Sequence, residues 1–326
     1  MTDVLLTGAT GTVGHALAQR LVADGRRVRA LVRSPRRAQT LLGEGVEPVP
    51  GDVTDRASIA AALEGCAAVF HAAGLPEQWR LDPGDFHRVN TEGTRNLVEA
   101  ALASGVERFV YTSTIDVFAW TPGGRFDESS LDPELRPTHY ERSKQDADRI
   151  VTAALDEGLP AVFLHPSAVY GPAPVLAAGL NDFIARLARR KIPLLLPGGM
   201  PVVHAADVAE GHVRAAADAP VGGRYILSGD YHSLEQIAQA VKRHEPRARV
   251  PRVLPVGFAR AISAAGERIA LYTKRPPLIP RGALYFVTSH PVPDASRAQR
   301  ELGWSSRSFD DGLADTLDHF RSRNWD

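Results

Sequence analysis

Three glycines at three-residue spacing, between an apolar run and an amphipathic helical pattern, constrain the fold more than any other feature of this 326-residue chain. Residues 4–14 read VLLTGATGTVG, and the helical pattern that follows leads into a second apolar run at residues 28–32. This order predicts a strand, a tight turn, a helix and a second strand. An isolated glycine triplet is typical of any surface turn, but this context favours a turn that binds a dinucleotide.

Each glycine has a different physical task in such a turn. Gly8 can adopt the positive φ that a tight strand-to-helix turn requires, Gly11 lets a pyrophosphate approach the backbone, and Gly14 lets the helix pack directly on the strand. The free N–H groups at the helix start then face the anion. We therefore predict that this segment contacts the cofactor, through Gly8, Thr10, Gly11, Thr12, Val13 and Gly14.

Strand and helix patterns continue to alternate after this first unit. Short apolar runs lie at residues 48–52, 67–72, 108–112 and 162–165, with helical patterns between them. Such alternation predicts an α/β fold, a Rossmann-type doubly wound parallel sheet with helices on both faces. Ligands of these sheets bind at the carboxyl ends of the strands.

Clusters of Pro and Gly break this alternation from residue 166 onward, which indicates a second, smaller lobe. We predict a dinucleotide-binding domain over residues 1–168, with its sheet completed by about 202–230, and a substrate lobe mainly from 169–201 and 231–326. Residues 256–271 of that lobe form an apolar helical stretch interrupted by a few charges. These few charges favour a substrate lid or a core helix over a helix on a membrane surface.

The charge balance argues against nucleic acid as a partner. Lys and Arg together number 38, as do Asp and Glu, whereas a protein that binds polyanions is usually basic. The single cysteine, Cys66, excludes an intramolecular disulfide, and no apolar run approaches the length of a membrane span. Because the first strand begins at Val4 with no basic segment before it, we expect no signal peptide and a cytoplasmic protein.

Two segments carry the predicted chemistry. Tyr140 and Lys144 stand four residues apart in a helical pattern, so they share one helix face. A Tyr hydroxyl has a pKa of about 10, and a neighbouring ammonium lowers it, which suits proton transfer as a hydride moves at the adjacent carbon. Thr114 or Ser113, just after the strand over 108–112, would bind the same substrate oxygen. Either member of the pair alone would be typical of a surface, but together with the glycine turn they indicate catalysis.

These segments make the chain resemble the extended short-chain dehydrogenase/reductases, and within them the 3β-hydroxysteroid dehydrogenase and dihydroflavonol reductase branch. The resemblance covers most of the chain and rests on TGATGTVG at 7–14, GDVTD at 51–55, HAAG at 71–74, VNTEGTRNLVEAA at 89–101, YTST at 111–114, the YxxxK pair at 140–144, HPSAVYGP at 165–172, VVHAADVA at 202–209 and RAQRELGW at 297–304. It implies catalytic roles for Tyr140, Lys144 and a strand-end hydroxyl. Thr114 stands where the family usually has serine. His165 stands where the family commonly has arginine, and we expect a structural or pocket-edge role for it.

The same resemblance implies further contacts with the dinucleotide. They are made by Asp52 and Val53 beside the adenine, Ala72 and Ala73 along the dinucleotide path, and Val169 near the nicotinamide. Asn90 has two open interpretations, since it could position the lysine through water or cap a helix.

The end of the second strand bears on the choice of cofactor. NAD-selective sites hold the ribose 2′-hydroxyl with an acid there, but this chain has Val32 and Arg33. Arg33, helped by Arg36 or Arg37, could instead bind a 2′-phosphate, unless these arginines form only a solvated turn. We therefore predict NADP(H) as the preferred cofactor, with NAD(H) as the alternative.

The resembled family contains reductases, dehydrogenases, sugar-nucleotide epimerases and dehydratases, so the fold alone does not choose the reaction. Its dehydratases commonly carry an Asp-Glu pair where this chain has Ile115 and Asp116, which leaves one carboxylate and argues against dehydration. We predict an NADP(H)-dependent oxidoreductase that interconverts a ketone or aldehyde and an alcohol. The alternatives are a sugar-nucleotide epimerase or dehydratase with bound NAD(P), and an NADP(H)-binding sensor without turnover.

The residues expected to line the substrate pocket are mostly large and apolar, which suits a hydrophobic or aromatic small molecule. They are Leu75, Trp79, Asp116, Phe118, Trp120, His139 and Tyr170. Trp79 and Trp120 could instead pack the lobe, and Asp116 could be a solvated loop residue. We expect a monomer or a homodimer, and no metal site.

Overall fold

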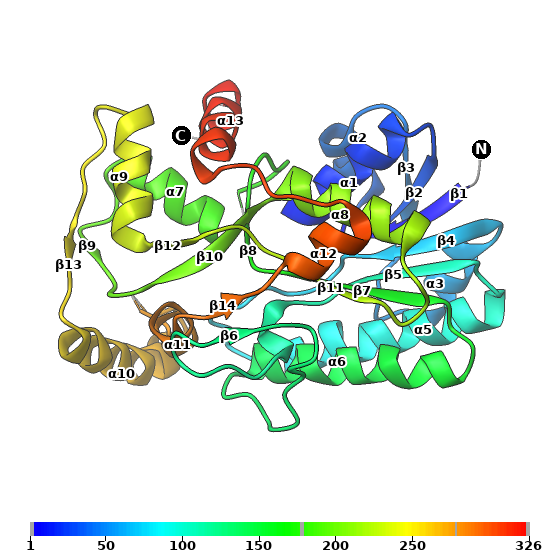
Figure 1. Cartoon of the computed structure of the whole chain (residues 1–326), viewed down its shortest axis with the longest axis horizontal. Coiled ribbons are helices and arrows are strands. Elements are labelled where there is room, and N and C mark those ends of the chain that lie inside the picture. Colours follow the sequence, from blue (N-terminus) through cyan, green and yellow to red (C-terminus); the bar gives the residue numbers. More distant parts are fainter. Residues whose placement is uncertain (1–2, 177–178, 278, 324–326) are drawn as a thin grey trace.

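The centre of the molecule is a sheet of seven parallel strands (Figure 1), in a computed structural model that describes residues 3–176, 179–277 and 279–323. From one edge to the other, the strands are β3 (Val46–Pro50), β2 (Arg27–Val32), β1 (Asp3–Thr7), β4 (Cys66–His71), β5 (Arg108–Thr112), β7 (Ala161–Pro166) and β11 (Arg224–Leu227). The strand order reverses between β1 and β4, and such sheets bind their ligand at the carboxyl ends of the strands beside that point. The predicted Rossmann-type α/β fold is confirmed.

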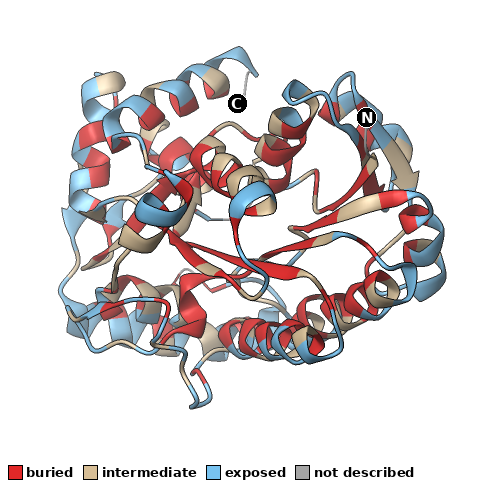
Figure 2. Cartoon of the chain, turned by 45° about the vertical axis from the view of Figure 1, so that its right-hand side comes forward, coloured by how far each residue is buried: buried red, intermediate tan, exposed pale blue. Residues whose placement is uncertain are grey.

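Helices cover both faces of this sheet. One face packs against α1 (Thr12–Ala23), α8 (Ala205–Asp218) and α12 (Ser296–Leu302), and the other against α3 (Arg56–Leu63), α5 (Gly93–Ser104) and α6 (His139–Asp156). Successive strand residues point to opposite faces, so Val4 and Leu6 of β1 enter one core and Leu5 enters the other. The buried residues accordingly lie between the layers (Figure 2).

Four short elements connect the strands of this sheet. They are α2 (Pro35–Leu42) beside β3, α4 (Gly84–Phe86), the π-helical turn η1 (His87–Glu92) before α5, and the 3₁₀ turn η2 (Ile115–Val117) after β5. Because η2 directly follows the Thr114 segment, it sets the direction in which the chain leaves the carboxyl end of β5.

The remaining elements form smaller sheets and the helices around them. A three-stranded sheet contains β8 (Ala168–Tyr170), β10 (Gly199–His204) and β12 (Tyr231–Ser233), and a third core joins it to α7 (Leu180–Ala188), α9 (Leu234–His244) and α13 (Phe309–Ser322). Two-residue strands pair as β9 (Leu194–Leu195) with β13 (Arg252–Val253), and as β6 (Arg125–Phe126) with β14 (Val292–Pro293). β11 completes the large sheet, whereas β10 pairs with β8 and β12.

Two further helices, α10 (Val256–Thr273) and α11 (Arg281–Ser289), form a hairpin at one end of the molecule (Figure 1). α10 buries only Ala259, Ser263 and Ala270, so the interpretation of this stretch as a core helix is wrong. Ala259 packs with Ile279, just before α11, and with Leu284 of α11, in a small cluster apart from the three larger cores. None of the helices in the described part of the chain is both long enough and apolar enough to cross a membrane.

Candidate active site

The glycine turn after β1 has no room for side chains at two of its three glycines. Gly8 has a φ of 75°, and a Cβ added there would lie 2.5 Å from the carbonyl oxygen of Ala72. A Cβ on Gly14 would lie 2.1 Å from the carbonyl oxygen of Gly8, so α1 packs directly on the turn. Gly11 is exposed at the N-cap of α1, where no side chain caps the helix. The N–H groups at the start of α1 thus face outward without a capping side chain, and the turn fits a pyrophosphate.

The ends of β1 and β4 are tied together beside this turn. The hydroxyl of Thr7 accepts a hydrogen bond from the N–H of Ala73 at 3.1 Å and is 2.8 Å from Nδ1 of His71. Ala72 and Ala73 therefore lie next to Gly8 at the carboxyl edge of the sheet, as a dinucleotide path would require. The other side chains predicted at the turn are half-buried around it: Thr10, Thr12 and Val13.

The residues predicted near the adenosine half lie at the next strand ends. Arg33 is exposed directly after β2, and the described residues include no ion-pair partner for it. Asp52 follows β3, and its carboxylate accepts hydrogen bonds from the N–H of Thr54 at 2.9 Å and from its hydroxyl at 2.8 Å. Val53 is buried against Gly93 of α5. Val169, predicted near the nicotinamide, is half-buried in β8.

The predicted Tyr–Lys pair lies in the first two turns of α6. A capping box starts this helix, because the N–H of Glu141 donates to the hydroxyl of Thr138 at 3.1 Å and the N–H of Thr138 donates to the Glu141 carboxylate at 3.0 Å. Lys144 is buried, and its ammonium donates to the carbonyl oxygen of Thr112 at 2.9 Å. That bond holds the helix face of Tyr140 and Lys144 against the carboxyl end of β5.

The electrostatics around Tyr140 differ from the expectation. Burial, followed by the Asp116 carboxylate, raises the pKa of Tyr140, although a hydrogen bond with the Thr114 hydroxyl lowers it. Burial in turn lowers the pKa of Lys144 to about 8, against the opposing effect of Asp148. In this structure, where the Lys144 ammonium is bonded to the Thr112 carbonyl, burial outweighs the effects that lower the pKa of Tyr140, and a role of Lys144 toward the phenolate stays a prediction.

Of the two strand-end hydroxyls, only Thr114 faces the pair. Thr114 is buried, and its hydroxyl donates to the Asp116 carboxylate at 2.9 Å while also contacting Tyr140. Ser113 donates to the carboxylate of Asp148 at 2.7 Å, and Arg224 bonds to the same carboxylate. The role considered for Ser113 as a second substrate-binding hydroxyl is corrected, because its hydroxyl is used to hold α6.

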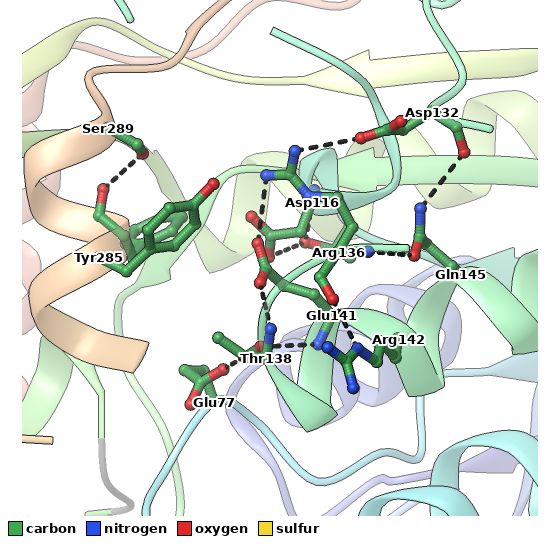
Figure 3. A network of polar contacts seen from close by, with 12 residues as sticks. Glu77, Asp116, Asp132, Arg136, Thr138, Glu141, Arg142, Gln145, Tyr285 and Ser289 are labelled. Atoms are coloured by element: carbon green, nitrogen blue, oxygen red, sulfur yellow. Dashed lines mark hydrogen bonds and ion pairs between the residues drawn. The ribbon is translucent and has the colours of Figure 1, made fainter. Parts of the chain in front are cut away.

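A buried cluster of charged residues surrounds Asp116 (Figure 3). Arg136 pairs with Glu141 and with Asp132, each at 3.2 Å, and its guanidinium carbon lies 4.0 Å from the centroid of the Trp120 ring. The hydroxyl of Thr138 donates to Glu77 at 2.9 Å, which brings a second carboxyl group from the loop after β4 to this cluster. The ring of Tyr285, on α11, points toward the cluster from the opposite side (Figure 3).

Two carboxyl groups of this cluster bind protons more tightly than carboxyls normally do. Burial, and then repulsion from Glu141, raises the pKa of Asp116 to about 7. Burial also raises the pKa of Glu77 to about 7, and the hydrogen bond from Thr138 opposes that rise. One oxygen of Asp116, Oδ1, is buried and has no hydrogen-bond partner among the described residues. Asp116 is therefore an acid beside Tyr140 with one unused oxygen, and the interpretation of it as a solvated loop residue is wrong.

The raised pKa of Asp116 predicts a pH dependence of stability. An unfolded Asp has a pKa of about 4, so between pH 4 and pH 7 the native chain holds a proton here that the unfolded chain has lost. Asp116 thus lowers the free energy of unfolding progressively through this window, and the full penalty is present above pH 7. The difference in free energy of unfolding between wild type and Asp116→Asn should change by on the order of 1–3 kcal/mol over the window, in favour of the variant at the higher pH.

Urea unfolding at pH 4, 5.5 and 7.5 measures this difference. The exposed residue Glu134 supplies a control, Glu134→Gln, whose difference from wild type should stay constant over the same range. An Asp116→Asn difference that also stays constant would contradict the assignment.

The structure separates the predicted pocket residues into two groups. Leu75 and Trp79 are half-buried in the loop after β4, on the side of the site. Phe118 and Tyr170 are corrected to core residues, because Phe118 is fully buried against Phe126, and Tyr170 packs between His204 and Phe309.

Two further pocket predictions also change. Trp120 stacks on Phe126 with ring centroids 5.3 Å apart and carries Arg136 on its ring, so it packs the lobe. His139 is exposed at the first residue of α6, which places it at the rim of the site at most.

Asn90 and His165 both have structural roles. The Asn90 amide oxygen accepts from the N–H of Leu75 at 2.7 Å, and its NH₂ group donates to the Leu75 carbonyl and to the Ser143 hydroxyl. The amide therefore joins the loop after β4 to α6 and does not cap a helix, while the interpretation that it positions the lysine through water stays a prediction. His165 is fully buried, with Nδ1 3.2 Å from the carbonyl oxygen of Thr114, and burial lowers its pKa to about 3. A neutral His165 supports the backbone of Thr114, as a structural histidine would.

Sequence reasoning missed three members of the site, Glu77, Arg136 and Glu141. Glu141 had a local signal, since Thr138 and Glu141 have the spacing of a capping box before a helix. Glu77 had none, because its partner Thr138 lies across a contact between the loop after β4 and the start of α6. The partners of Arg136, Asp132 and Glu141, are close in sequence, but Arg136 lies in a loop where no helical spacing relates them.

Comparisons with known proteins agree with this arrangement. Residues 4–228 match the NAD dependent epimerase/dehydratase family. The chain is 31% identical over 330 residues to a putative dihydroflavonol 4-reductase from Synechocystis sp., a match that covers 98% of this chain and 95% of the relative. It is also 31% identical to a 4-hydroxy-2-methyl-3-oxo-4-farnesyl-3,4-dihydroquinoline-1-oxide ketoreductase from Stigmatella aurantiaca, with 93% and 91% of the two chains covered. Among solved structures, a UDP-glucose 4-epimerase from Thermus thermophilus in complex with NAD superposes with a TM-score of 0.79 at 25% identity, covering 98% of this chain and 99% of the epimerase.

Proposed function

Because the chain belongs to the NAD dependent epimerase/dehydratase family, and with it to the extended short-chain dehydrogenase/reductases, we propose that it is an NADP(H)-dependent oxidoreductase. The reaction would interconvert a ketone or aldehyde and an alcohol on a hydrophobic or aromatic small molecule. The observation that carries this proposal is the contact of Tyr140 with Thr114, next to a buried Lys144. These groups lie at the same edge of the sheet as the glycine turn.

In the proposed mechanism, a bound nicotinamide supplies the hydride, and the residues of the chain handle the proton. The Tyr140 hydroxyl donates its proton to the carbonyl oxygen as the carbonyl carbon accepts the hydride. The Thr114 hydroxyl, which donates to Asp116 in the structure, turns to the same oxygen and orients it. The Lys144 ammonium stabilises the phenolate that Tyr140 becomes. Oxidation of an alcohol runs through the same groups in reverse.

The glycine turn and the neighbouring strand ends would hold the dinucleotide in this mechanism. Gly8, Gly11 and Gly14 leave the backbone free to bind the pyrophosphate, and Ala72 and Ala73 present small side chains along its path. We further propose that Val169 lies near the nicotinamide, and that Asp52 and Val53 lie near the adenine.

Two kinds of evidence support an apolar substrate: the names of relatives and the side chains that border the site. The names of two relatives denote a dihydroflavonol reductase and a ketoreductase of a farnesyl-bearing dihydroquinoline oxide. In this chain, Leu75 and Trp79 border the site from the loop after β4, and the Tyr285 ring points toward it from α11. Large apolar side chains of this kind are typical of pockets for ring-shaped or prenylated molecules.

The preference for NADP(H) rests on Arg33, which we propose to bind the 2′-phosphate. Arg33→Glu should raise the Kd for NADPH by about 10–100-fold, because a charge-assisted hydrogen bond is replaced by repulsion, and should leave the Kd for NADH nearly unchanged. Fluorescence titration with both nucleotides measures the two constants. The control is Lys242→Glu, an exposed charge reversal on α9. An equal loss for NADPH and NADH in Arg33→Glu would refute the assignment.

A second candidate is an epimerisation or elimination on a sugar nucleotide. It is favoured by Glu77, which brings a second carboxyl group to the Asp116 cluster, where the neighbouring position in sequence is Ile115. Burial raises the pKa of both carboxyl groups to about 7. The experiment that separates the candidates is a panel of carbonyls, alcohols and sugar nucleotides with all four nicotinamide forms. Oxidoreduction consumes added NADPH or NADP⁺ in proportion to product. Epimerisation or dehydration gives product with no net change in added nicotinamide, and would overturn the proposal.

A further inference from the structure

The outward face of α10 carries a continuous stripe of apolar side chains. Phe258, Ile262, Ala265, Ile269 and Tyr272 recur at spacings of four, three, four and three residues, which places them on one side of a helix. All five are exposed, with 67% of Phe258, 60% of Ile269 and 89% of Tyr272 open to solvent. The buried residues of α10, among them Ala259 and Ala270, lie on a different side of the helix. A stripe of this kind is not a normal solvent-facing surface.

The segment that contains this stripe is cationic, although the few charges of residues 256–271 alone favour a lid or a core helix. Residues 246–281 contain eight Lys or Arg residues and a single carboxylate, Glu267, although the whole chain has no net formal charge. Glu267 is already paired with Arg281 at 3.0 Å. Four exposed cations have no ion pair among the described residues: Arg260, Arg268, Lys274 and Arg275. Unpaired cations beside exposed aromatic and aliphatic groups are complementary to a surface that is both anionic and apolar.

The same hairpin covers the candidate active site from outside. Gly282 of α11 lies against Glu77, since a Cβ on this glycine would be 2.4 Å from a Glu77 carboxylate oxygen. Tyr285 of the same helix points toward Asp116 and Arg136 (Figure 3). The N–H of Arg281 donates to Glu267 at 3.0 Å, which joins the start of α11 to α10. A surface that binds α10 would therefore be linked, through α11, to the part of the hairpin that lies over Glu77 and Asp116.

We propose that the apolar and cationic face of α10 binds the surface of a membrane that contains anionic lipids. Phe258, Ile262, Ile269 and Tyr272 would enter the boundary between headgroups and acyl chains, and the unpaired Arg and Lys residues would contact lipid phosphates. A second copy of the chain is disfavoured as the occupant, because pairing two α10 helices brings their cations together with no free carboxylate on the helix to neutralise them. This proposal does not depend on the proposed reaction.

Sedimentation of the full chain with vesicles tests the proposal. The chain should sediment with vesicles that contain phosphatidylglycerol, remain in solution with pure phosphatidylcholine, and be released from the anionic vesicles by salt. Phe258→Ser with Ile269→Ser should weaken binding by roughly a factor of ten or more, because both apolar side chains are lost. Arg268→Glu with Lys274→Glu should weaken it by a similar factor while keeping the apolar stripe.

A matched control is Val221→Ser, which removes an exposed aliphatic side chain of comparable exposure, 57%, in the loop before β11. It should bind like wild type. Circular dichroism and the thermal midpoint of each variant show whether it is folded. If the double serine variant does not fold, the double glutamate variant still tests the proposal. The absence of wild-type binding to anionic vesicles would overturn the proposal. So would salt-independent binding to neutral vesicles, or a dimer in light scattering that the serine variant dissociates.

Discussion

Tyr140→Phe is expected to lower the turnover number by a factor of about 10² to 10⁴, because the variant keeps the ring but loses the proton donor. The loss should appear in kcat more than in KM, since the hydroxyl acts on the transition state. The Kd for NADPH should change by less than about threefold, because the ring still packs against Phe86, with centroids 6.1 Å apart. Steady-state NADPH oxidation with a substrate from the panel, together with nucleotide titration, measures all three quantities.

Tyr272→Phe is the control for this experiment. Tyr272 is 89% exposed on α10, so removal of its hydroxyl should leave turnover unchanged. A Tyr140→Phe variant with normal nucleotide binding and full turnover would refute the assignment of Tyr140 as the acid. Such a result would direct attention to Asp116, which is the nearest acid to Thr114.

Arg136→Met is expected to lower the free energy of unfolding by about 3–5 kcal/mol, the range observed when one partner of a buried ion pair is removed. Arg136 is 6% exposed, and the substitution leaves Glu141, which is 4% exposed, without its cation. Urea unfolding at pH 8 measures the change, because carboxyl groups are then ionised and the unpaired charge carries its full penalty.

Two further variants separate the loss of the ion pair from the loss of side-chain packing. Arg149→Met removes an exposed Arg that pairs with Asp146 at 3.5 Å, and it should cost less than about 1 kcal/mol. Adding Glu141→Gln to Arg136→Met should restore part of the stability, because no buried charge remains unpaired. Equal losses in Arg136→Met and Arg149→Met would mean that the buried pair contributes no more than a surface pair.

The parts of the fold that sequence predicts are those with strong local periodicity. The strands β1, β2, β4, β5 and β7 are short apolar runs, and a parallel strand buried on both faces needs such a run. The helices α2, α7 and α11 were missed. α2 begins at Pro35 in a cationic turn, and α7 and α11 are short helices in a segment rich in Pro and Gly.

The residues of the candidate site likewise divide into those that a local sequence pattern predicts and those that it does not. Tyr140, Lys144 and the glycine turn could be predicted because helix spacing and turn geometry relate residues that are close in sequence. Glu77 and Thr138 meet across 61 residues, and no local pattern encodes that contact. Phe118 and Tyr170 show a different limit, because an aromatic residue next to a motif has the same sequence signature whether it lines a pocket or fills a core.

The small cluster of Ala259, Ile279 and Leu284 has a consequence for how the site is reached. α10 joins the rest of the protein mainly through this cluster, whereas α11 also enters the third core through Val287, with Phe286 packed against that core. The free energy needed to detach α10 alone is therefore expected to be smaller than the free energy of global unfolding. Local opening of the hairpin is therefore expected to begin at α10, while the third core keeps α11 packed beside Glu77.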